Sequence, residues 1–227
     1  MNSREEILGA IRRSLGRGEL PADARAECAA RLDRHDENLV PERARSLSPR
    51  ERVELFVKMA EAVNATVARV KSAKDAPGAV ADYLAGLNLP PAVVAAPDPA
   101  LDDLDWSAKP LLEVRQGAVG DNDPAAAVTP CFAAVAETGT LMLLSGGTRP
   151  TRNNFLPDTH IVVLRRDQVV AAYEDGFARL RAAGPDMPRT VNFITGPSRT
   201  ADIEQKIELG VHGPRRLHIV LIDDGAR

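Results

Sequence analysis

The sequence predicts an α/β domain with a mostly parallel sheet flanked by helices, preceded by an N-terminal helical arm. Short apolar runs recur along the chain, at residues 93–95, 111–114, 132–136, 140–144, 161–164, 191–195 and 217–222. These runs are continuously apolar, as in strands that a parallel sheet buries on both faces, and helical periodicity fills several of the intervals between them. A chain of 227 residues, 44% of them hydrophobic, is long enough to bury one substantial core.

The first 47 residues are predicted to form the helical arm and a linker, and residues 48–227 the α/β domain. The arm opens with a capping-box spacing and an amphipathic helix over residues 3–15. The apolar stripe of this helix consists of Ile7, Ile11 and Leu15. The stripe can dock on the rest of the chain, on a second copy or on a partner, and all three outcomes stay open.

Helices are also predicted within the domain. Ser48-Pro49-Arg50-Glu51 combines a cap, a proline at the first helical position and a capping-box glutamate. The apolar stripe after it predicts one core-facing helix up to residue 70, through Val53, Phe56, Val57, Ala60, Val63, Val67 and Val70. Further helices are expected at residues 75–84, 169–180 and 200–209, and residues 117–129 are expected to be a connector rich in glycine, proline and alanine.

The charge balance and the cysteine count exclude several functions. The formal net charge of -3 gives no global field that would draw the chain to nucleic acid or to an anionic membrane. The N-terminus lacks the apolar core of a signal peptide and no apolar run is long enough to span a bilayer, so we expect a cytoplasmic protein. Cys28 and Cys131 cannot supply the four thiolates of an ordinary iron–sulfur cluster, and no histidines have metal-ligand spacing. We therefore expect this chain to bind no metal or cofactor, and any iron–sulfur centre to belong to a partner.

Glu137 is the candidate for a reactive group. It lies between the predicted strands at residues 132–136 and 140–144, and Thr138 and Gly139 follow it. Beside apolar strands, its carboxylate can act as a base or as a nucleophile that forms an acyl intermediate. Alternatively, Thr138 and Gly139 lock a structural turn and the two strands form a hairpin. Gly139 permits the close approach of either a ligand or another backbone.

A first glycine loop, Gly146-Gly147-Thr148-Arg149, supplies further candidates. The guanidinium of Arg149 either faces a ligand or is solvated. The spacing matches neither a Walker motif nor a dinucleotide fingerprint.

A second glycine loop, Gly196-Pro197-Ser198-Arg199-Thr200, joins the strand at residues 191–195 to the helix expected at residues 200–209. In a parallel sheet ligands bind outside the carboxyl ends of the strands, and free N–H groups at a helix start favour an anion. The loop is therefore a candidate anion site. Alternatively, Ser198 or Thr200 only caps the helix. His212 lies between two glycines beyond this helix, which is expected to carry it away from the crevice.

Three motifs, in this order, give the sequence a family resemblance: Ala136-Glu137-Thr138-Gly139-Thr140, Gly196-Pro197-Ser198-Arg199-Thr200-Ala201-Asp202-Ile203-Glu204 and Gly210-Val211-His212-Gly213-Pro214. From about residue 48 to its C-terminus, the chain resembles the lactate utilization (LUD) family, and within it the lactate utilization protein C type. The helix at residues 3–15 is also similar to the start of such proteins. The chain departs from the family at Thr129-Pro130-Cys131-Phe132, where glycine and small residues are more usual.

The resemblance implies a domain similar to the sugar-phosphate isomerase and CoA-transferase superfamily. It also implies an accessory subunit of a three-component system that oxidises L-lactate to pyruvate, with iron–sulfur clusters on the companion subunits. In CoA-transferases a Ser-Glu-Asn-Gly turn supplies the glutamate that accepts the acyl group, and Ala136-Glu137-Thr138-Gly139 is similar to it. The alternative is a stand-alone enzyme or sensor for a CoA or phosphate ligand that uses Glu137. For a small anionic ligand, the candidate binding residues are Thr138, Gly139, Thr140, Gly146, Gly147, Arg149, Gly196, Ser198, Arg199, Thr200 and His212.

Overall fold

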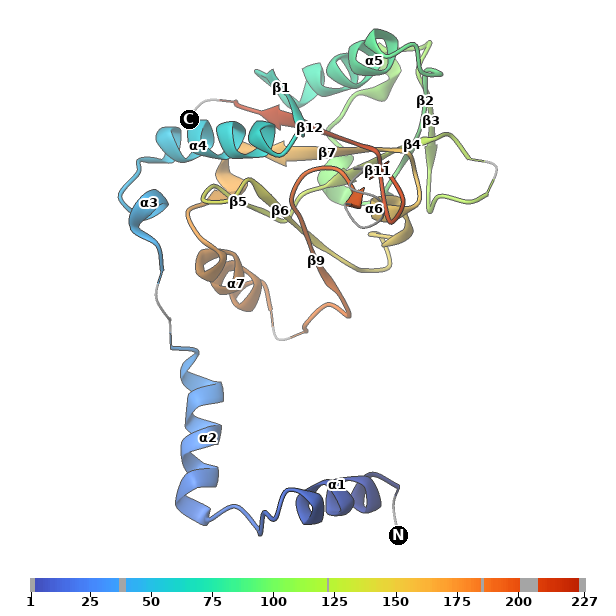
Figure 1. The fold of residues 1–227 in the computed structure, drawn as a ribbon. Helices are drawn as coiled ribbons and strands as arrows, with labels where there is room; N and C mark the ends of the chain where they lie inside the picture. Colours follow the sequence, from blue (N-terminus) through green and yellow to red (C-terminus); the bar gives the residue numbers. More distant parts are fainter. Residues whose placement is uncertain (1–2, 37–39, 122, 185, 201–207, 225–227) are drawn as a thin grey trace. The chain divides into compact units, whose positions relative to one another are not determined.

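The computed structural model describes residues 3–36, 40–121, 123–184, 186–200 and 208–224 of the chain (Figure 1). The chain divides into two compact units, Met1–Val40 and Pro41–Arg227. The first unit contains the helices α1 (Ser3–Ser14) and α2 (Ala22–Arg34), neither of which buries a residue. Helix α1 confirms the helix predicted at the start of the chain. In the described part of the chain, no helix is long and apolar enough to cross a membrane.

The second unit is built on a six-stranded sheet in the order β1-β12-β7-β4-β2-β3 (Figure 1). All neighbouring strands in it are parallel. The strands are β1 (Thr66–Val70), β2 (Ala92–Ala95), β3 (Glu113–Gln116), β4 (Ala126–Pro130), β7 (Thr159–Arg165) and β12 (Arg216–Ile222). The predicted α/β architecture with a mostly parallel sheet is therefore confirmed.

Helices cover both faces of this sheet. Helix α5 (Ala76–Gly86) packs through Val80 and Leu84 into the core on one face. Helix α4 (Pro49–Ala62) packs through Phe56 and Ala60 into the core on the other face. The capping box predicted at Ser48 opens α4. The shorter helices and 3-10 turns are α3 (Glu42–Arg45), η1 (Ala73–Asp75), η2 (Pro99–Leu101), η3 (Trp106–Ala108), α6 (Arg152–Phe155) and η4 (Arg166–Gln168).

A second, four-stranded sheet packs on the α4 side of the parallel sheet, in the order β8-β5-β6-β9. Its strands are β5 (Ala133–Val135), β6 (Thr140–Leu144), β8 (Val169–Val170) and β9 (Val191–Ile194). Strands β5 and β6 form an antiparallel hairpin, and β9 pairs antiparallel with β6. Helix α7 (Tyr173–Ala182) covers the outer face through Leu180, which joins a cluster with Ala133 and Met142. The hairpin alternative for the two runs around Glu137 is thus the one observed.

Two local predictions are wrong at the helix–strand boundary. The helix expected to reach residue 70 ends at Ala62, because Asn64 takes a left-handed φ of 64° and the following residues form β1. Val67 and Val70 therefore belong to a strand, although they continue the helical spacing. The helix expected at residues 169–180 begins only at Tyr173, after β8.

Two further predictions are wrong, and a third is confirmed in part. The connector expected at residues 117–129 contains β4, a central strand of the parallel sheet. The strand expected at residues 191–195 is confirmed as β9, but it belongs to the second sheet and not to the parallel one. A helix is predicted at residues 200–209, and this prediction is wrong at both ends of the range. There the structure has two short strands, β10 (Arg199–Thr200) and β11 (Glu208–Leu209), which pair antiparallel. The rest of that prediction, at residues 201–207, lies outside the described residues.

Candidate ligand-binding cavity

A cavity of about 460 Å³ lies where the loop after β9 meets the loop before β12. His160 and Leu217, the second residues of β7 and β12, also line it. The cavity therefore lies by the amino-terminal ends of these parallel strands. The expectation of a crevice at the carboxyl ends is wrong for this loop, because β9 pairs with β6 in the second sheet and not with the parallel strands.

Gly196 and Ser198 hold the two loops of the cavity in place. Gly196 has a φ of +72°, and a Cβ there would lie 2.4 Å from the carbonyl oxygen of Val63, so the position requires glycine. The N–H of Ser198 donates to the carbonyl of Pro214 at 2.8 Å, and the N–H of His212 donates to Ser198 Oγ at 3.4 Å. His212 therefore lies in the cavity wall and not away from it, as the sequence led us to expect.

Arg199 is the cation of the cavity wall. Its side chain is exposed, and its Nη2 donates to the carbonyl of Val63 at 3.2 Å. The described residues that line the cavity include no aspartate and no glutamate. The local charge therefore favours a neutral or anionic ligand over a cation.

His160 adds a buried, uncharged imidazole to the wall. Its side chain is 0% exposed, and its Nε2 lies 2.7 Å from Thr129 Oγ1. Burial lowers the pKa of His160 to about 3, so the ring is neutral at pH 7. Its Nδ1 has no hydrogen-bond partner among the described residues. His160 therefore shapes the wall from a buried position, and its unpaired Nδ1 costs free energy there.

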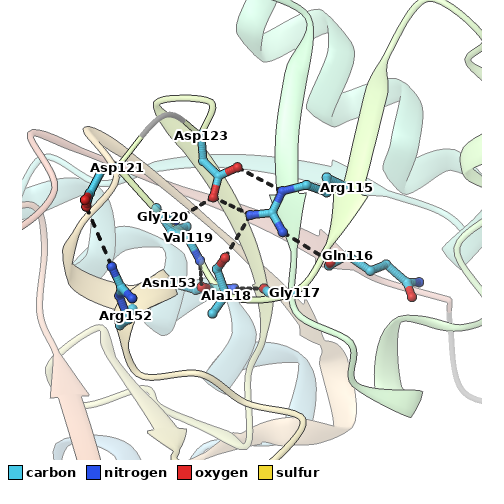
Figure 2. A network of polar contacts seen from close by, with 10 residues as sticks. All are labelled: Arg115, Gln116, Gly117, Ala118, Val119, Gly120, Asp121, Asp123, Arg152 and Asn153. Atoms are coloured by element: carbon cyan, nitrogen blue, oxygen red, sulfur yellow. Dashed lines mark hydrogen bonds and ion pairs between the residues drawn. The ribbon is translucent and has the colours of Figure 1, made fainter.

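Helix α6 brings Asn154 and Phe155 to the cavity. The preceding residue, Asn153, is fully buried and anchors the helix to the loop after β3. Asn153 Oδ1 accepts from the N–H of Val119 at 2.8 Å, and its Nδ2 donates to the carbonyl of Gly117 at 2.8 Å (Figure 2). This pair of bonds fixes the start of α6 and hence the position of its two cavity residues.

The loop that receives Asn153 is itself cross-linked. Arg115 Nε donates to Asp123 Oδ1 at 2.9 Å, and Arg115 Nη2 donates to the carbonyl of Ala118 at 2.8 Å (Figure 2). The N–H of Gly120 also donates to the Asp123 carboxylate. The Gly120 bond and the Arg115 bonds and charge hold the pKa of Asp123 below its usual value. The loop that holds α6 is therefore itself held by an ion pair and several hydrogen bonds.

Glu137 lies in the hairpin turn between β5 and β6, outside the wall of the cavity. Its N–H donates to the carbonyl of Ala171 at 3.2 Å, and its carbonyl accepts from the Arg43 guanidinium. Gly139 in this turn has a φ of +67°, and a Cβ there would lie 2.4 Å from the backbone nitrogen of Ala60 in α4. The group that approaches Gly139 is therefore a helix backbone.

A cluster of four hydroxyl groups connects the Glu137 turn to the cavity. Thr140 Oγ1 lies 2.7 Å from Thr138 Oγ1, 2.9 Å from the Tyr173 hydroxyl and 2.7 Å from Thr195 Oγ1. Thr195 also lines the cavity. Thr140 is thus one hydrogen bond away from the cavity wall, and Thr138 is two hydrogen bonds away.

Gly146, Gly147 and Arg149 line a separate depression of about 800 Å³. Arg149 Nε donates to Asp98 Oδ2 at 2.5 Å, and the Asp98 side chain is 1% exposed. Burial alone would raise the pKa of Asp98, but hydrogen bonds from Arg149, Ala100 and Thr148 outweigh it, so the net shift is downward. Arg149 is therefore neither a cavity residue nor a freely solvated cation.

The structure gathers four of the predicted residues in one cavity: Gly196, Ser198, Arg199 and His212. Thr200 pairs with Glu208 between β10 and β11. The cavity residues that sequence reasoning did not name as candidates include Asn154, Phe155, His160, Phe193 and Thr195. The asparagine pair Asn153-Asn154 after the first glycine loop is a sequence signal for Asn154 alone. The ligand-binding roles themselves stay predictions.

Fold and cavity together define an α/β protein in which a parallel six-stranded sheet carries a second, hairpin-containing sheet and a ligand-sized cavity. Residues 53–222 match the family model of the LUD domain. The chain belongs to the LUD domain family.

Proteins named lactate utilization protein C are similar in sequence. The one from Deinococcus radiodurans is 34% identical over 161 residues, which cover 66% of this chain and 70% of that protein. Lactate utilization protein C 1 from Bacillus mycoides is 33% identical over 93 residues, 40% of each chain. The protein from Geobacillus sp. strain WCH70 is 36% identical over 93 residues, 40% of this chain and 39% of that protein. The match therefore spans about two fifths of the length of the last two relatives.

A solved structure shares the fold. The crystal structure of a DUF162 family protein from Deinococcus radiodurans is 26% identical, with a TM-score of 0.56. The similarity covers 78% of this chain and 99% of that one.

Proposed function

We propose that this chain is an accessory subunit of a cytoplasmic system that oxidises L-lactate to pyruvate, with iron–sulfur centres on partner subunits. The observation that carries the proposal is the similarity to proteins named lactate utilization protein C, one of which matches over 66% of this chain. The family match over residues 53–222 supports the same assignment.

The residues of this chain support a division of labour. Oxidation of lactate to pyruvate releases electrons, so the system needs a redox centre. Cys131 is buried, and burial raises the pKa of its thiol to about 12, which disfavours the thiolate that a metal requires. Among the described residues, no three His, Cys, Asp or Glu side chains are grouped as a metal site needs. We therefore assign electron transfer to the partners and ligand binding to this chain.

The cavity supplies groups for a small anionic ligand. The guanidinium of Arg199 and the hydroxyl of Ser198 are donors in its wall, and no acidic side chain of the described wall opposes them.

Affinity purification of the tagged full chain under anaerobic conditions tests the proposal. We expect co-purification of iron-bearing subunits and reduction of a redox dye that depends on L-lactate. D-lactate and a tagged unrelated protein from the same cells serve as controls. Recovery without iron, or dye reduction that does not depend on L-lactate, would overturn the assignment.

A second candidate function uses Glu137 as in the CoA-transferase-like turn. The hydroxyl cluster that joins this turn to the cavity favours it. In this reaction a Glu137 oxygen attacks the thioester carbonyl of an acyl-CoA, the C–S bond breaks, and CoA leaves as the thiolate. The product is an acyl anhydride on Glu137. Hydroxylamine should then release an acyl hydroxamate from the wild-type chain and not from Glu137→Gln. The absence of any adduct with a panel of acyl-CoAs would remove this candidate.

A further inference from the structure

We propose that the cavity binds a planar heteroaromatic nucleotide, with its ring against the exposed phenylalanines Phe155 and Phe193 and its phosphate at Arg199. This inference goes beyond the lactate assignment and does not depend on it. It rests on the size of the cavity, on the two exposed aromatic rings in its wall and on its exposed guanidinium.

The cavity has room for more than a three-carbon acid. Its volume of about 460 Å³ falls within the range of roughly 300–1,000 Å³ in which proteins hold drug-sized ligands. A lactate ion would leave most of this volume to water. A ring with a sugar phosphate is of the size that such a cavity encloses.

Two phenylalanine rings in the cavity wall are unusually exposed. Phe155 is 40% exposed and Phe193 is 39% exposed, and both line the cavity. Phe193 is supported from behind, because its ring centroid lies 5.5 Å from that of Tyr173 and 5.6 Å from that of Phe177. Exposed aromatic faces on a rigid support are the platforms on which proteins stack planar rings.

The polar groups of the wall differ in how much surface they offer a ligand. His160 is 0% exposed and Asn154 is 4% exposed, so both shape the wall and offer a ligand little or no surface, whereas Arg199 is exposed. A phosphate is costly to bury without partners, so it binds at the exposed guanidinium of Arg199 and the hydroxyl of Ser198.

Titration of the isolated full chain by calorimetry tests the inference with four probes. Flavin mononucleotide and AMP carry both ring and phosphate, riboflavin carries a ring without phosphate, and inorganic phosphate carries no ring. We expect at least one of the two nucleotides to bind at a single site and more tightly than inorganic phosphate. If neither nucleotide binds, or if inorganic phosphate binds as tightly as they do, the inference is wrong.

Matched variants identify the ring site. Phe155→Ala removes a cavity ring, and Leu156→Ala truncates the next side chain, which is 56% exposed and lies outside the cavity wall. We expect Phe155→Ala to weaken nucleotide binding by roughly fivefold or more, and Leu156→Ala to weaken it less. Equal effects of the two variants would refute stacking on Phe155. Phe193→Leu, which keeps an apolar side chain, gives the same test if Phe155→Ala does not fold.

A third variant identifies the phosphate site. Arg199→Gln should weaken the binding of flavin mononucleotide and leave the binding of riboflavin unchanged. An equal loss for both probes would contradict a phosphate at Arg199. These titrations use the chain without partners, so their failure would leave the lactate-dependent assay of the co-purified complex unaffected, and the reverse also holds.

Discussion

Replacing Gly139 with alanine tests whether helix α4 holds the turn that contains Glu137. At the observed φ of +67°, an added Cβ would lie 2.4 Å from the backbone nitrogen of Ala60 and 2.6 Å from the carbonyl carbon of Met59. Ordinary van der Waals contact begins at 3.4 Å. Helix α4 must therefore move away by about 1 Å, or the turn must change its conformation.

If the turn keeps its conformation and α4 moves, two costs add. An alanine in the left-handed region costs about 1–2 kcal/mol. Displacement of α4 disturbs a closely packed core, since Phe56 and Ala60 are both 0% exposed, and overpacking of this kind costs about 1–3 kcal/mol. We expect Gly139→Ala to lower the free energy of unfolding by roughly 2–5 kcal/mol. This loss is a large part of the ~5–15 kcal/mol that stabilises an ordinary domain.

Urea unfolding followed by circular dichroism measures this loss. Gly147→Ala is the matched control, because a Cβ there would meet nothing within 4 Å and its φ is not positive. We expect the control to stay within about 0.5 kcal/mol of the wild type. Equal stability of the two variants would refute the packing argument and return Gly139 to the list of positions open to a ligand.

The buried ionisable groups provide three more tests. Arg149→Ala leaves the Asp98 carboxylate without its cation, and should lower the free energy of unfolding by about 2 kcal/mol at neutral pH. That loss should shrink as the pH falls through the lowered pKa of Asp98, and a constant loss in acid would contradict the pairing. Because burial lowers the pKa of His160 to about 3, unfolding should take up a proton between pH 6.5 and about 3, so stability falls as the pH falls in this window. In His160→Asn the slope of stability against pH near pH 5 should decrease by about 1.4 kcal/mol per unit, and an unchanged slope would speak against a neutral imidazole. A thiol reagent should label exposed Cys28 and not buried Cys131 in the folded chain, and both in denaturant; mass spectrometry of the labelled peptides decides the outcome.

The parts of the fold that the sequence predicted are those in which one local pattern has one structural meaning. The continuous apolar runs of β7 and β12 are long and are flanked by turn residues, and both strands are central in the parallel sheet. The capping box at Ser48 opens α4 as predicted, because a helix start depends on hydrogen bonds within four residues. The close approach that glycine permits at residue 139 is observed, and the group that approaches is the backbone of α4.

Other parts depended on contacts that no local pattern contains. Strand β4 is rich in alanine and ends in proline, and it is a strand because β2 and β7 pair with it on either side. Val67 and Val70 continue the helical spacing of α4, yet they lie in a strand that pairs with β12. Strand β9 pairs antiparallel with β6, so the loop predicted to bind an anion follows a strand of the second sheet and not of the parallel sheet.

The candidate site divides in the same way. The motifs by themselves determined that Gly196, Ser198 and His212 belong to constrained loops of the LUD domain family. Only the tertiary structure decided that these loops enclose one cavity, that the buried His160 forms part of its wall, and that Glu137 lies outside that wall. The physical reason is that sequence periodicity reports how each residue is buried, whereas a cavity depends on which distant elements meet, and that is decided by the packing of two sheets and their helices.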